Sequence, residues 1–550
     1  MADPGTIDGA SAIARILERE GVERFFLFPD NKLIDPCARL GIAPTMARSE
    51  RAAIAMADGY TRAHDARRLG VVIVQFGPGI ENSFGAVAQA YSDSSPILVV
   101  CGQLDQGRID SQPAFDAVRS FRDVTKWAVR INRAQRIPEL LRRAFTYLRN
   151  GRPGPVLVEV PDDVMGEAIA IADVEDYLPV RATRSVPDAT AIAEVTDALT
   201  GARRPLLHAG HGVLYARATA ELVELAELLD APVMTTLAGK SAFPEDHPLS
   251  VGTGARAAPR AAARFLADAD VIFGIGSSFS IGPYSAPLPR AARLIQATID
   301  DRDLNKDYAV HQLLIGDARL TMRAILDELA ARGTERRTPT VAPRIAAIAA
   351  EDRREWQPRR EFGEAPMSPY RVIDEIARAL AGRPSTVTHD AGSPRDQLSP
   401  FWVATVPRSY IGWGKSTHLG YGYGLALGAK LALPDRIVLN FMGDAAIGMS
   451  GMEIETAVRL RIPIVTIVLN NGAMACYEER YPYAVEHHRL KYLGGDYAAL
   501  ARALGAHAER VERPAEIGPA LERALAANTD GVPALLDVAT VEDAAYSRYW

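Results

Sequence analysis

Residues 436–445 read RIVLNFMGDA and residues 463–473 read PIVTIVLNNGA, and these two stretches decide the fold. Each contains an apolar run of strand length that ends in small polar residues, which is typical of a buried strand followed by a turn. Between them, Met452–Leu460 combines helix-forming residues with apolar residues at helical spacing. The order strand, helix, strand predicts a β-α-β unit whose two parallel strands end at the same edge of one sheet.

Asp444 and Asn471 come directly after the two predicted strands, so we expect both side chains to lie at that edge. A carboxylate and an amide oxygen are hard ligands that suit Mg²⁺, which completes its octahedron with phosphate oxygens. The same residues would also be explained as two structural turns, because Asp, Asn and Gly all favour turns. The pattern alone leaves both explanations open.

A second pattern lies near the N-terminus. Glu50 opens an alanine-rich stretch, Glu50–Arg62, that predicts a helix. A strand is predicted over Val71–Val74, and the turn Gly77-Pro78-Gly79 follows it. Taken by itself, Glu50 is explained as a solvated carboxylate at a helix N-terminus, where the helix dipole favours negative charge.

Together the two patterns resemble the thiamine diphosphate (ThDP) enzyme superfamily. In that superfamily a Gly-Asp-Gly motif followed by Asn-Asn binds the diphosphate, and a Glu that opens an "ADGY-R" helix binds the pyrimidine ring. The second motif reads Ala57-Asp58-Gly59-Tyr60-Thr61-Arg62 here. The first departs from the family at Ala445, and a positive φ at that position would cost Ala about 1 kcal/mol. The resemblance covers nearly the whole chain and is greatest to acetolactate synthases, benzaldehyde lyases and benzoylformate decarboxylases.

Strands and helices alternate along the whole chain, which predicts an α/β fold with doubly wound parallel sheets. We expect three domains, in the order that the superfamily has: a pyrimidine-binding domain at 1–175, a central domain at 189–335 and a diphosphate-binding domain at 365–550. Residues 333–369 are charged and contain proline, and they are predicted to be a linker. The aromatic and basic C-terminal residues 546–550 are predicted to fray.

The resemblance also implies roles for single residues. Asp444 and Asn471, with a backbone carbonyl from the Gly472-Ala473 turn, would hold Mg²⁺ against the diphosphate. Leu419 matches the bulky apolar residue that bends the cofactor, although ordinary core packing explains it as well. Glu50 would be a catalytic residue that hydrogen-bonds the pyrimidine ring and favours its imino tautomer. The implied cofactor-binding residues are Glu50, Gly77, Pro78, Leu419, Gly443, Asp444, Ala445, Ala446 and Asn471, and the implied metal-binding residues are Asp444, Asn471 and Ala473.

The reaction is less well marked than the cofactor. Gln75 stands where benzoylformate decarboxylases carry a working His, and Gln112 lines up with the Gln of benzaldehyde lyases. Both are therefore candidate catalytic residues, and both are also explained as loop amides. The acetolactate synthase pattern AFQE reads Ala114-Phe115-Asp116-Ala117 here, and the His pair of pyruvate decarboxylases is not visible. Lys415 and His418 are further candidates for contact with a carboxylate or phosphate.

We therefore predict a ThDP- and Mg²⁺-dependent lyase or transferase. It would make or break a C–C bond beside a carbonyl through an acyl-anion equivalent, with acyloin, 2-hydroxy acid or 2-oxo acid substrates. Three alternatives stay open: a 2-oxo acid decarboxylase, a 2-hydroxyacyl-CoA lyase, and an inactive cofactor-binding regulatory subunit. A nicotinamide dehydrogenase is not favoured, because a complete dinucleotide fingerprint is missing.

Composition narrows the expected partners. The net charge of -6 and the 24% of charged residues give no sign of nucleic acid or an anionic membrane as partner. No apolar run is long enough to cross a membrane, and the N-terminus does not read as a secretory signal. Three widely spaced cysteines fit a reducing compartment, so we expect a cytoplasmic protein. The partner implied by the resemblance is a small-molecule carbonyl substrate.

Two further expectations come from the resemblance. The active site would lie at a subunit interface, so a homodimer or homotetramer is expected. Some relatives bind FAD or ADP in the central domain, and Gly274-Ile275-Gly276 follows a predicted strand there. Glycine at such a place more often makes a tight turn, so a bound FAD or ADP stays open.

Overall fold

The computed structural model describes residues 5–111 and 114–550 of the chain. In these residues three six-stranded sheets are present, and every strand pairing within them is parallel. A short antiparallel pair joins β1 (Thr6–Asp8) to β8 (Ala168–Ala170). The predicted α/β fold with parallel, helix-covered sheets is confirmed.

The chain divides into two compact units that are not contiguous in sequence. The first unit comprises Met1–Thr183, Ser416–Pro434 and Ser450–Ile462. The second comprises Arg184–Lys415, Asp435–Met449 and Pro463–Trp550. Two short segments of the C-terminal third therefore belong to the first unit, whereas the predicted domain boundaries place them in the diphosphate-binding domain; those boundaries stay a prediction.

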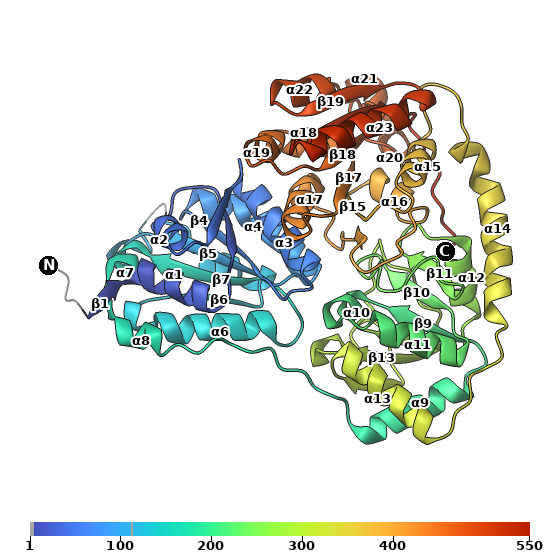
Figure 1. Cartoon of the computed structure of the whole chain (residues 1–550), viewed down its shortest axis with the longest axis horizontal. Coiled ribbons are helices and arrows are strands. Elements are labelled where there is room, and N and C mark those ends of the chain that lie inside the picture. The colour runs from blue at the N-terminus through green and yellow to red at the C-terminus, as the bar shows by residue number, and fades with distance from the viewer. Residues whose placement is uncertain (1–4, 112–113) are drawn as a thin grey trace. The chain divides into compact units, whose positions relative to one another are not determined.

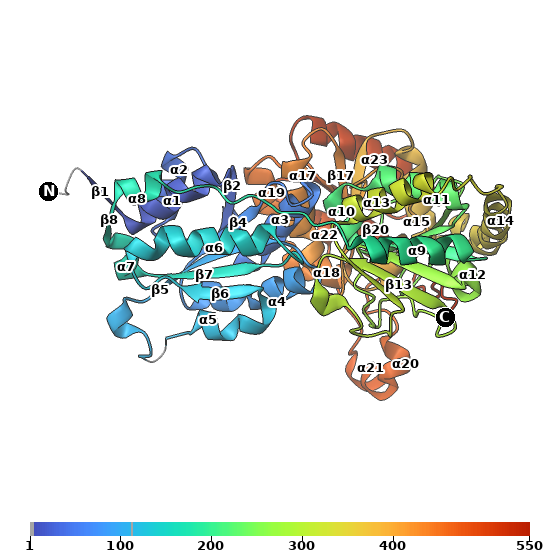
Figure 2. The ribbon, with the colours of Figure 1, turned by 90° about the horizontal axis from the view of Figure 1, so that it is seen from below.

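The sheet of the first unit has helices on both faces (Figures 1 and 2). Helices α1, α2 and α6 cover one face, where their apolar residues pack against Val71, Leu98 and Val156 of the strands. Helices α3 and α4 cover the other face, and this explains why the central strands are almost entirely apolar. The strand order is β3 (Ala43–Met46), β2 (Arg24–Leu27), β4 (Gly70–Val74), β5 (Ile97–Gln103), β7 (Val156–Pro161), β6 (Trp127–Arg130); the helices are α1 (Gly9–Arg19), α2 (Ile34–Arg39), α3 (Glu50–Ala63), α4 (Pro78–Ser92), α5 (Ala117–Ser120), α6 (Ile137–Arg149), α7 (Asp162–Gly166), α8 (Ile171–Glu175), α17 (Tyr421–Ala432) and α19 (Glu453–Arg459).

Helix α17 packs against α3 with the two backbones unusually close. A Cβ at Gly428 would lie 1.9 Å from the carbonyl oxygen of Met56, and a Cβ at Gly59 would lie 2.0 Å from that of Leu425. Both distances are far below van der Waals contact, so only glycine fits at these positions. The hydroxyl of Tyr421, at the start of α17, also donates to the buried carboxylate of Asp58 (2.9 Å).

The second unit contains two sheets. Its central-domain sheet has the order β11-β10-β9-β12-β13-β14, which is the 3-2-1-4-5-6 order of doubly wound dinucleotide folds. The order reverses between β9 and β12, and ligands of such folds bind at that reversal. Its strands are β9 (Pro205–Ala209), β10 (Val233–Thr236), β11 (Ser250–Gly254), β12 (Val271–Ile275), β13 (Arg293–Thr298) and β14 (Gln312–Ile315); its helices are α9 (Ala189–Gly201), α10 (His211–Ala216), α11 (Thr219–Leu229), α12 (Arg260–Asp268) and α13 (Ala318–Ala331).

The other sheet of the second unit contains the predicted β-α-β strands. Strands β17 and β18 are parallel neighbours, as predicted, with Gly443 beside Leu469 at their carboxyl ends. When its strands are numbered along the chain, this sheet has the same 2-1-3-4-6-5 order as the sheet of the first unit. Its strands are β15 (Ser385–His389), β16 (Tyr410–Ile411), β17 (Ile437–Gly443), β18 (Val465–Asn470), β19 (His507–Val511) and β20 (Ala534–Ala539); its helices are α15 (Pro369–Ala379), α16 (Ser393–Leu398), α18 (Asp444–Ser450), α20 (Tyr477–Arg480), α21 (Pro482–His488), α22 (Tyr497–Ala503) and α23 (Pro514–Thr529).

The segments between and after the predicted domains are more ordered than expected. The predicted linker 333–369 contains helix α14 (Val341–Arg360), which buries Ile345, Ile348 and Trp356. Its many charged residues hid this narrow apolar stripe. The C-terminal residues do not fray either: the N–H of Ala258 donates to the Ser547 carbonyl (2.8 Å), and the Ser547 hydroxyl donates to the Ala258 carbonyl (2.7 Å).

Candidate functional site

The carboxyl ends of β17 and β18 bring the predicted metal-binding residues together. Helix α18 begins at Asp444, directly after Gly443, and Asn471 follows the last residue of β18. The backbone N–H of Ala473 donates to Asp444 Oδ2 (3.1 Å) and to Asn471 Oδ1 (3.0 Å). One turn amide thus holds the carboxylate and the amide oxygen side by side.

The environment of Asp444 fits a divalent cation. The side chain is 3% exposed, and burial raises the pKa of its carboxyl group, although the N–H groups of Ala445 and Ala473 partly oppose this. No lysine or arginine of residues 5–111 and 114–550 forms an ion pair with it. A buried carboxylate without a cationic partner is unfavourable, and a bound Mg²⁺ would remove that penalty.

The neighbouring residues complete this edge. Ala445 lies in the first turn of α18 and does not have a positive φ, so alanine carries no backbone strain where the family usually has glycine. Ala446 follows in the same turn. Asn470 differs from Asn471, because its amide donates to Asp537 Oδ1 (2.8 Å) and it therefore fixes the sheet edge. The described residues contain no group of three or more His, Cys, Asp or Glu that could hold a metal, so a site here would have mixed carboxylate, amide and carbonyl ligands.

Glu50 is placed as the first residue of α3, in the first unit. Its side chain is 6% exposed, so it is not the solvated carboxylate that helix-dipole arguments alone would suggest. The amide of Asn82, on α4, donates to Glu50 Oε2 (2.7 Å). The sequence analysis assigned no role to Asn82, although it stands one helical turn after Pro78 on the helix that follows the predicted turn.

Gln75, Gly77 and Pro78 lie beside Glu50. Gly77 has φ +59° and caps α4, and Pro78 is the first residue of that helix. A Cβ at Gly79 would lie 2.5 Å from Gln75 Cγ and 3.4 Å from Glu50 Oε1. The structure therefore brings the acid, this glutamine and the predicted turn together. The other candidate glutamine, Gln112, lies outside the described residues.

The turn before α17 is held by residues of α3 and α4. The carbonyl of Leu419 accepts a hydrogen bond from the guanidinium of Arg51, the residue next to Glu50. The backbone N–H of His418 donates to Gln89 Oε1 (2.9 Å). Burial lowers the pKa of His418, which favours its neutral form and weakens the case for it as an anion ligand. Lys415, in the second unit, donates to Ser278 Oγ (3.1 Å).

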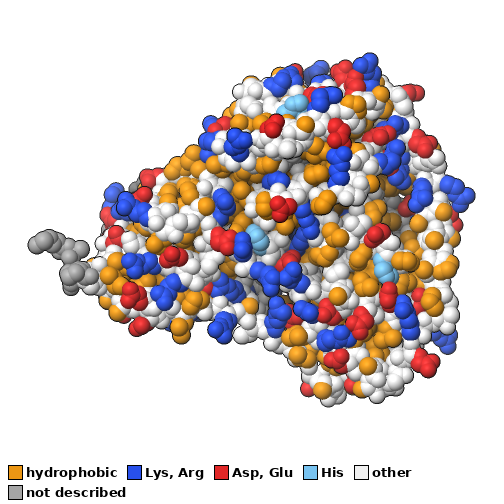
Figure 3. Space-filling model, in the orientation of Figure 1, with side chains coloured by type: hydrophobic (Ala, Val, Ile, Leu, Met, Phe, Trp, Pro, Cys, Tyr) orange, Lys and Arg blue, Asp and Glu red, His pale blue; other side chains and the backbone are white. Residues whose placement is uncertain are grey.

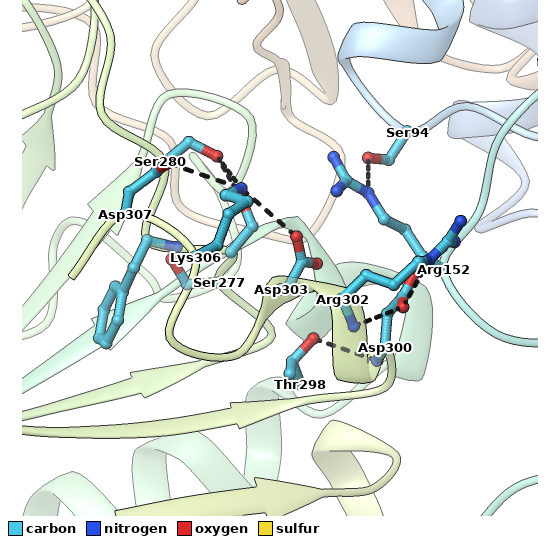
Figure 4. A network of polar contacts seen from close by, with 12 residues as sticks. Ser94, Arg152, Ser277, Ser280, Thr298, Asp300, Arg302, Asp303, Lys306 and Asp307 are labelled. Atoms are coloured by element: carbon cyan, nitrogen blue, oxygen red, sulfur yellow. Dashed lines mark hydrogen bonds and ion pairs between the residues drawn. The ribbon is translucent and has the colours of Figure 1, made fainter. Parts of the chain in front are cut away.

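The glycines of the central sheet pack against each other. A Cβ at Gly210 would lie 2.2 Å from the carbonyl oxygen of Gly276, which has φ +57°. Polar side chains near the ends of β12 and β13 pair locally, as Figure 4 shows for Lys306 with Ser280 (3.0 Å) and Arg302 with Asp300 (2.7 Å). Tight packing accounts for these glycines, and binding of FAD or ADP stays a prediction.

Comparison with known proteins assigns the family. Three family models match the chain: "Thiamine pyrophosphate enzyme, N-terminal TPP binding domain" at residues 7–120, the central domain at 192–325, and the "C-terminal TPP binding domain" at 390–538. A probable acetolactate synthase large subunit of Methanocaldococcus jannaschii is 31% identical over 96% of this chain and 91% of its own length. The chain belongs to the thiamine pyrophosphate enzyme family.

Other relatives of this thiamine pyrophosphate enzyme agree with that assignment. The acetolactate synthase large subunit of Corynebacterium glutamicum is 30% identical over 99% of this chain and 88% of its own length. The large subunit of acetolactate synthase isozyme 3 of Escherichia coli is 28% identical over 94% of this chain and 92% of its own length. Thiamine pyrophosphate is another name for ThDP, so the predicted superfamily and a ThDP-dependent enzyme of the acetolactate synthase type are confirmed.

Two observations concern the surface of this thiamine pyrophosphate enzyme. None of the described helices is both long and apolar enough to span a bilayer. Figure 3 shows acidic and basic side chains interspersed over the visible face, in keeping with the small net charge of -6.

Proposed function

We propose that the protein is a ThDP- and Mg²⁺-dependent carboligase that joins an acyl unit from a 2-oxo acid to a second carbonyl compound. The observation that carries the proposal is the buried, cation-free carboxylate of Asp444, which one backbone amide holds beside Asn471. The names of the relatives, all acetolactate synthases, support ligation rather than simple decarboxylation.

Asp444, Asn471 and the carbonyl of Ala473 would hold Mg²⁺ in this proposal. The N–H of Ala445 donates to Asp444 Oδ1 (2.8 Å). The resemblance implies that the positive end of the first turn of α18, near Ala445 and Ala446, faces the negatively charged diphosphate. The space beside the Cα of Gly443 is open, because the nearest atom to an added Cβ would be 3.7 Å away. The phosphate groups would approach the end of β17 through this space.

Bound ThDP would supply an electron sink that lets a carbonyl carbon react as an acyl anion. Glu50 would hold a hydrogen bond to a nitrogen of the pyrimidine ring and so control the proton at that nitrogen. Asn82 engages Glu50 Oε2, and we assign Oε1 to the ring. Leu419 would press the cofactor into a bent shape, and Gln75 would contact substrate because it lies beside the turn at Gly79.

A shared active site in a homodimer or homotetramer is part of the proposal. The resemblance implies that Glu50 of one subunit and the metal-binding motif of another subunit bind the same cofactor. Phe76 lies just before α4 and is 45% exposed, and Phe84 lies within α4 and is 41% exposed. Such exposure near a functional turn favours a surface that a second subunit covers.

Separate product measurements test the function. Purified protein with ThDP and Mg²⁺ is incubated with 2-oxo acids, alone and with aldehydes or a second 2-oxo acid, and carbon dioxide and ligated product are quantified independently. A carboligase releases both in equal amounts. Carbon dioxide without ligated product would favour a 2-oxo acid decarboxylase, and tight ThDP binding with neither product would favour a regulatory subunit. A visible absorption spectrum of the same sample tests for flavin.

A further inference from the structure

Glu453 is a buried carboxylate to which the proposed reaction gives no task. It is the first residue of α19 and is 3% exposed. Burial raises the pKa of its carboxyl group. Placing a carboxylate in the interior is costly unless hydrogen bonds compensate, so the partners of Glu453 should show what it is for.

Two of its three hydrogen bonds come from the turn that leads into Glu50. The backbone N–H of Arg48 donates to Glu453 Oε2 (3.0 Å), and the hydroxyl of Ser49 donates to Glu453 Oε1 (3.1 Å). The third comes from Thr456 of the same helix (2.8 Å). Both carboxylate oxygens are thus engaged, and each of them holds the segment immediately before the proposed catalytic acid.

Ser49 passes this restraint into helix α3. Its side chain caps the helix and accepts a hydrogen bond from the N–H of Ala52 (3.3 Å) while it donates to Glu453. A continuous chain of hydrogen bonds therefore runs from Glu453 through Ser49 to the first turn of α3. Glu50 is the first residue of that turn, so its backbone direction depends on this chain.

Other residues of α19 contact the same turn from its exposed side. Arg459 donates to the carbonyl of Met46 (2.7 Å), and Glu455 forms an ion pair with Arg48 (3.4 Å). Exposed ion pairs of this kind contribute little, so the buried bonds of Glu453 provide most of the restraint. In the sequence, α19 lies between Asp444 and Asn471, which means that the segment joining the two proposed metal ligands also anchors the turn at Glu50.

The number of donors explains why this residue is a carboxylate. Three donors converge on it, and a carboxylate offers two acceptor oxygens. A glutamine would offer one acceptor oxygen, and its NH₂ group would face a donor of the turn or of Thr456. An amide therefore cannot accept all three hydrogen bonds, and at best it reverses the direction of the bond with the Ser49 hydroxyl.

We propose that Glu453 is a positioning residue for Glu50: it anchors the Arg48-Ser49 turn and thereby sets the direction in which the Glu50 carboxylate points. This inference rests on the proposed role of Glu50 at the pyrimidine ring of ThDP. Glu453 itself touches neither cofactor nor substrate in the proposal.

The test is the variant Glu453→Gln. The rate of deuterium exchange at the thiazolium C2 of bound ThDP, followed by quench and NMR, is expected to fall about 10- to 100-fold, because small misplacements of a catalytic group have effects of this order. The Kd of ThDP and Mg²⁺ is expected to stay at the wild-type value, since the diphosphate residues are unchanged. A crystal structure of the variant should show the Glu50 carboxylate displaced.

Two further variants separate positioning from general damage. Glu455→Gln removes the exposed ion pair with Arg48 and keeps the bonds of Glu453, so it should exchange at the wild-type rate. Ser49→Ala keeps Glu453 and removes the linking hydroxyl, so it should slow exchange, and its effect should not add to that of Glu453→Gln. Should Glu453→Gln fail to fold, Ser49→Ala decides the question.

The variant Glu50→Gln distinguishes failure of the inference from failure of the proposed function. If Glu50→Gln slows exchange but Glu453→Gln exchanges at the wild-type rate, the inference is overturned and the proposed function stands. Where Glu453→Gln does not fold, wild-type exchange in Ser49→Ala has the same meaning. Wild-type exchange in Glu50→Gln would overturn the proposed role of Glu50, and the inference with it.

Discussion

The burial of Asp444 makes the proposed metal site dependent on pH. A protonated carboxyl group cannot ligate Mg²⁺, and burial raises the pKa of Asp444 in the metal-free protein. The affinity for Mg²⁺ and ThDP should therefore fall as the pH drops through this raised pKa, at a higher pH than an exposed aspartate would give. Calorimetric titrations at a series of pH values measure this, and an affinity that does not change with pH would contradict it.

The same raised pKa fixes the sign of a stability effect. The folded metal-free protein binds the Asp444 proton more tightly than the unfolded chain does, so this residue's contribution to the free energy of unfolding decreases as the pH rises between the two pKa values. Addition of Mg²⁺ and ThDP should remove that decrease. Asp444→Asn should abolish both the decrease and most of the stabilisation by the ligands.

Asn82 gives a second prediction at the level of single residues. Asn82→Asp would place a second carboxylate 2.7 Å from Glu50, and two neighbouring carboxylates raise the pKa of one of the pair. The acid limb of the pH profile of kcat/KM should move to higher pH, because two neighbouring carboxylates hold a shared proton more tightly than one carboxylate does. Asn82→Ala should lower kcat about 10-fold without moving that limb, as expected for loss of one hydrogen bond to a charged group. An unmoved acid limb in Asn82→Asp would contradict the assignment.

Local sequence signals identified some of these residues and could not identify others. Asp444 and Asn471 were predicted because apolar runs followed by turn residues mark strand ends. Glu50 was found through its helix motif, but its burial could not be foreseen. The partners Asn82 and Glu453 were missed because only the fold brings them to Glu50, and no pattern along the chain records such contacts.

At the level of helices and strands, the glycines between α3 and α17 determine how closely these helices pack. Gly428→Ala would place a methyl group 1.9 Å from the Met56 carbonyl, so the helices must separate. We expect a loss of about 1–3 kcal/mol in the free energy of unfolding, as for other overpacked sites. Urea denaturation measures the loss, and a matched control is Gly518→Ala in α23.

Gly518 is also helical, but no atom lies within 4 Å of an added Cβ there. Alanine gains helix propensity at Gly518 but its Cβ meets the ring of Pro519, so the free energy of unfolding should change by less than about 1 kcal/mol. Equal effects of the two substitutions would mean that α17 does not need glycine at the contact. Periodicity predicted β4, β17, β18, α3 and α19, yet it did not reveal α14, because a strongly charged helix resembles a loop.

Within the second unit, the C-terminal residues 546–550 contact elements that belong to both of its sheets. The Tyr546 hydroxyl lies 2.7 Å from Ser393 Oγ at the start of α16, whereas Ser547 bonds to Ala258 in front of α12. Tyr549 donates to Asp352 of α14 (2.8 Å). Deletion of residues 546–550 should therefore lower Tm by several degrees, about 2–4 °C for each kcal/mol lost.

Calorimetry of the deletion variant tests this expectation, with Tyr546→Phe as the matched control that removes one hydroxyl and keeps the tail docked. An unchanged Tm after deletion would show that the tail contacts carry no stability. The fold class and family were evident from the sequence, whereas this docking was not, because short aromatic and basic termini usually lack partners and only distant residues provide them here.

The assignment of α17 and α19 to the first unit limits how the gene can be cut. A fragment ending at Thr183 would lack both helices, so the small-residue face of α3 and the turn at Glu50 would meet water instead of protein. Such a fragment is a poor choice for separate expression or for a split-protein assay. A complete first unit would have to include residues 416–434 and 450–462 as well, in trans or by fusion.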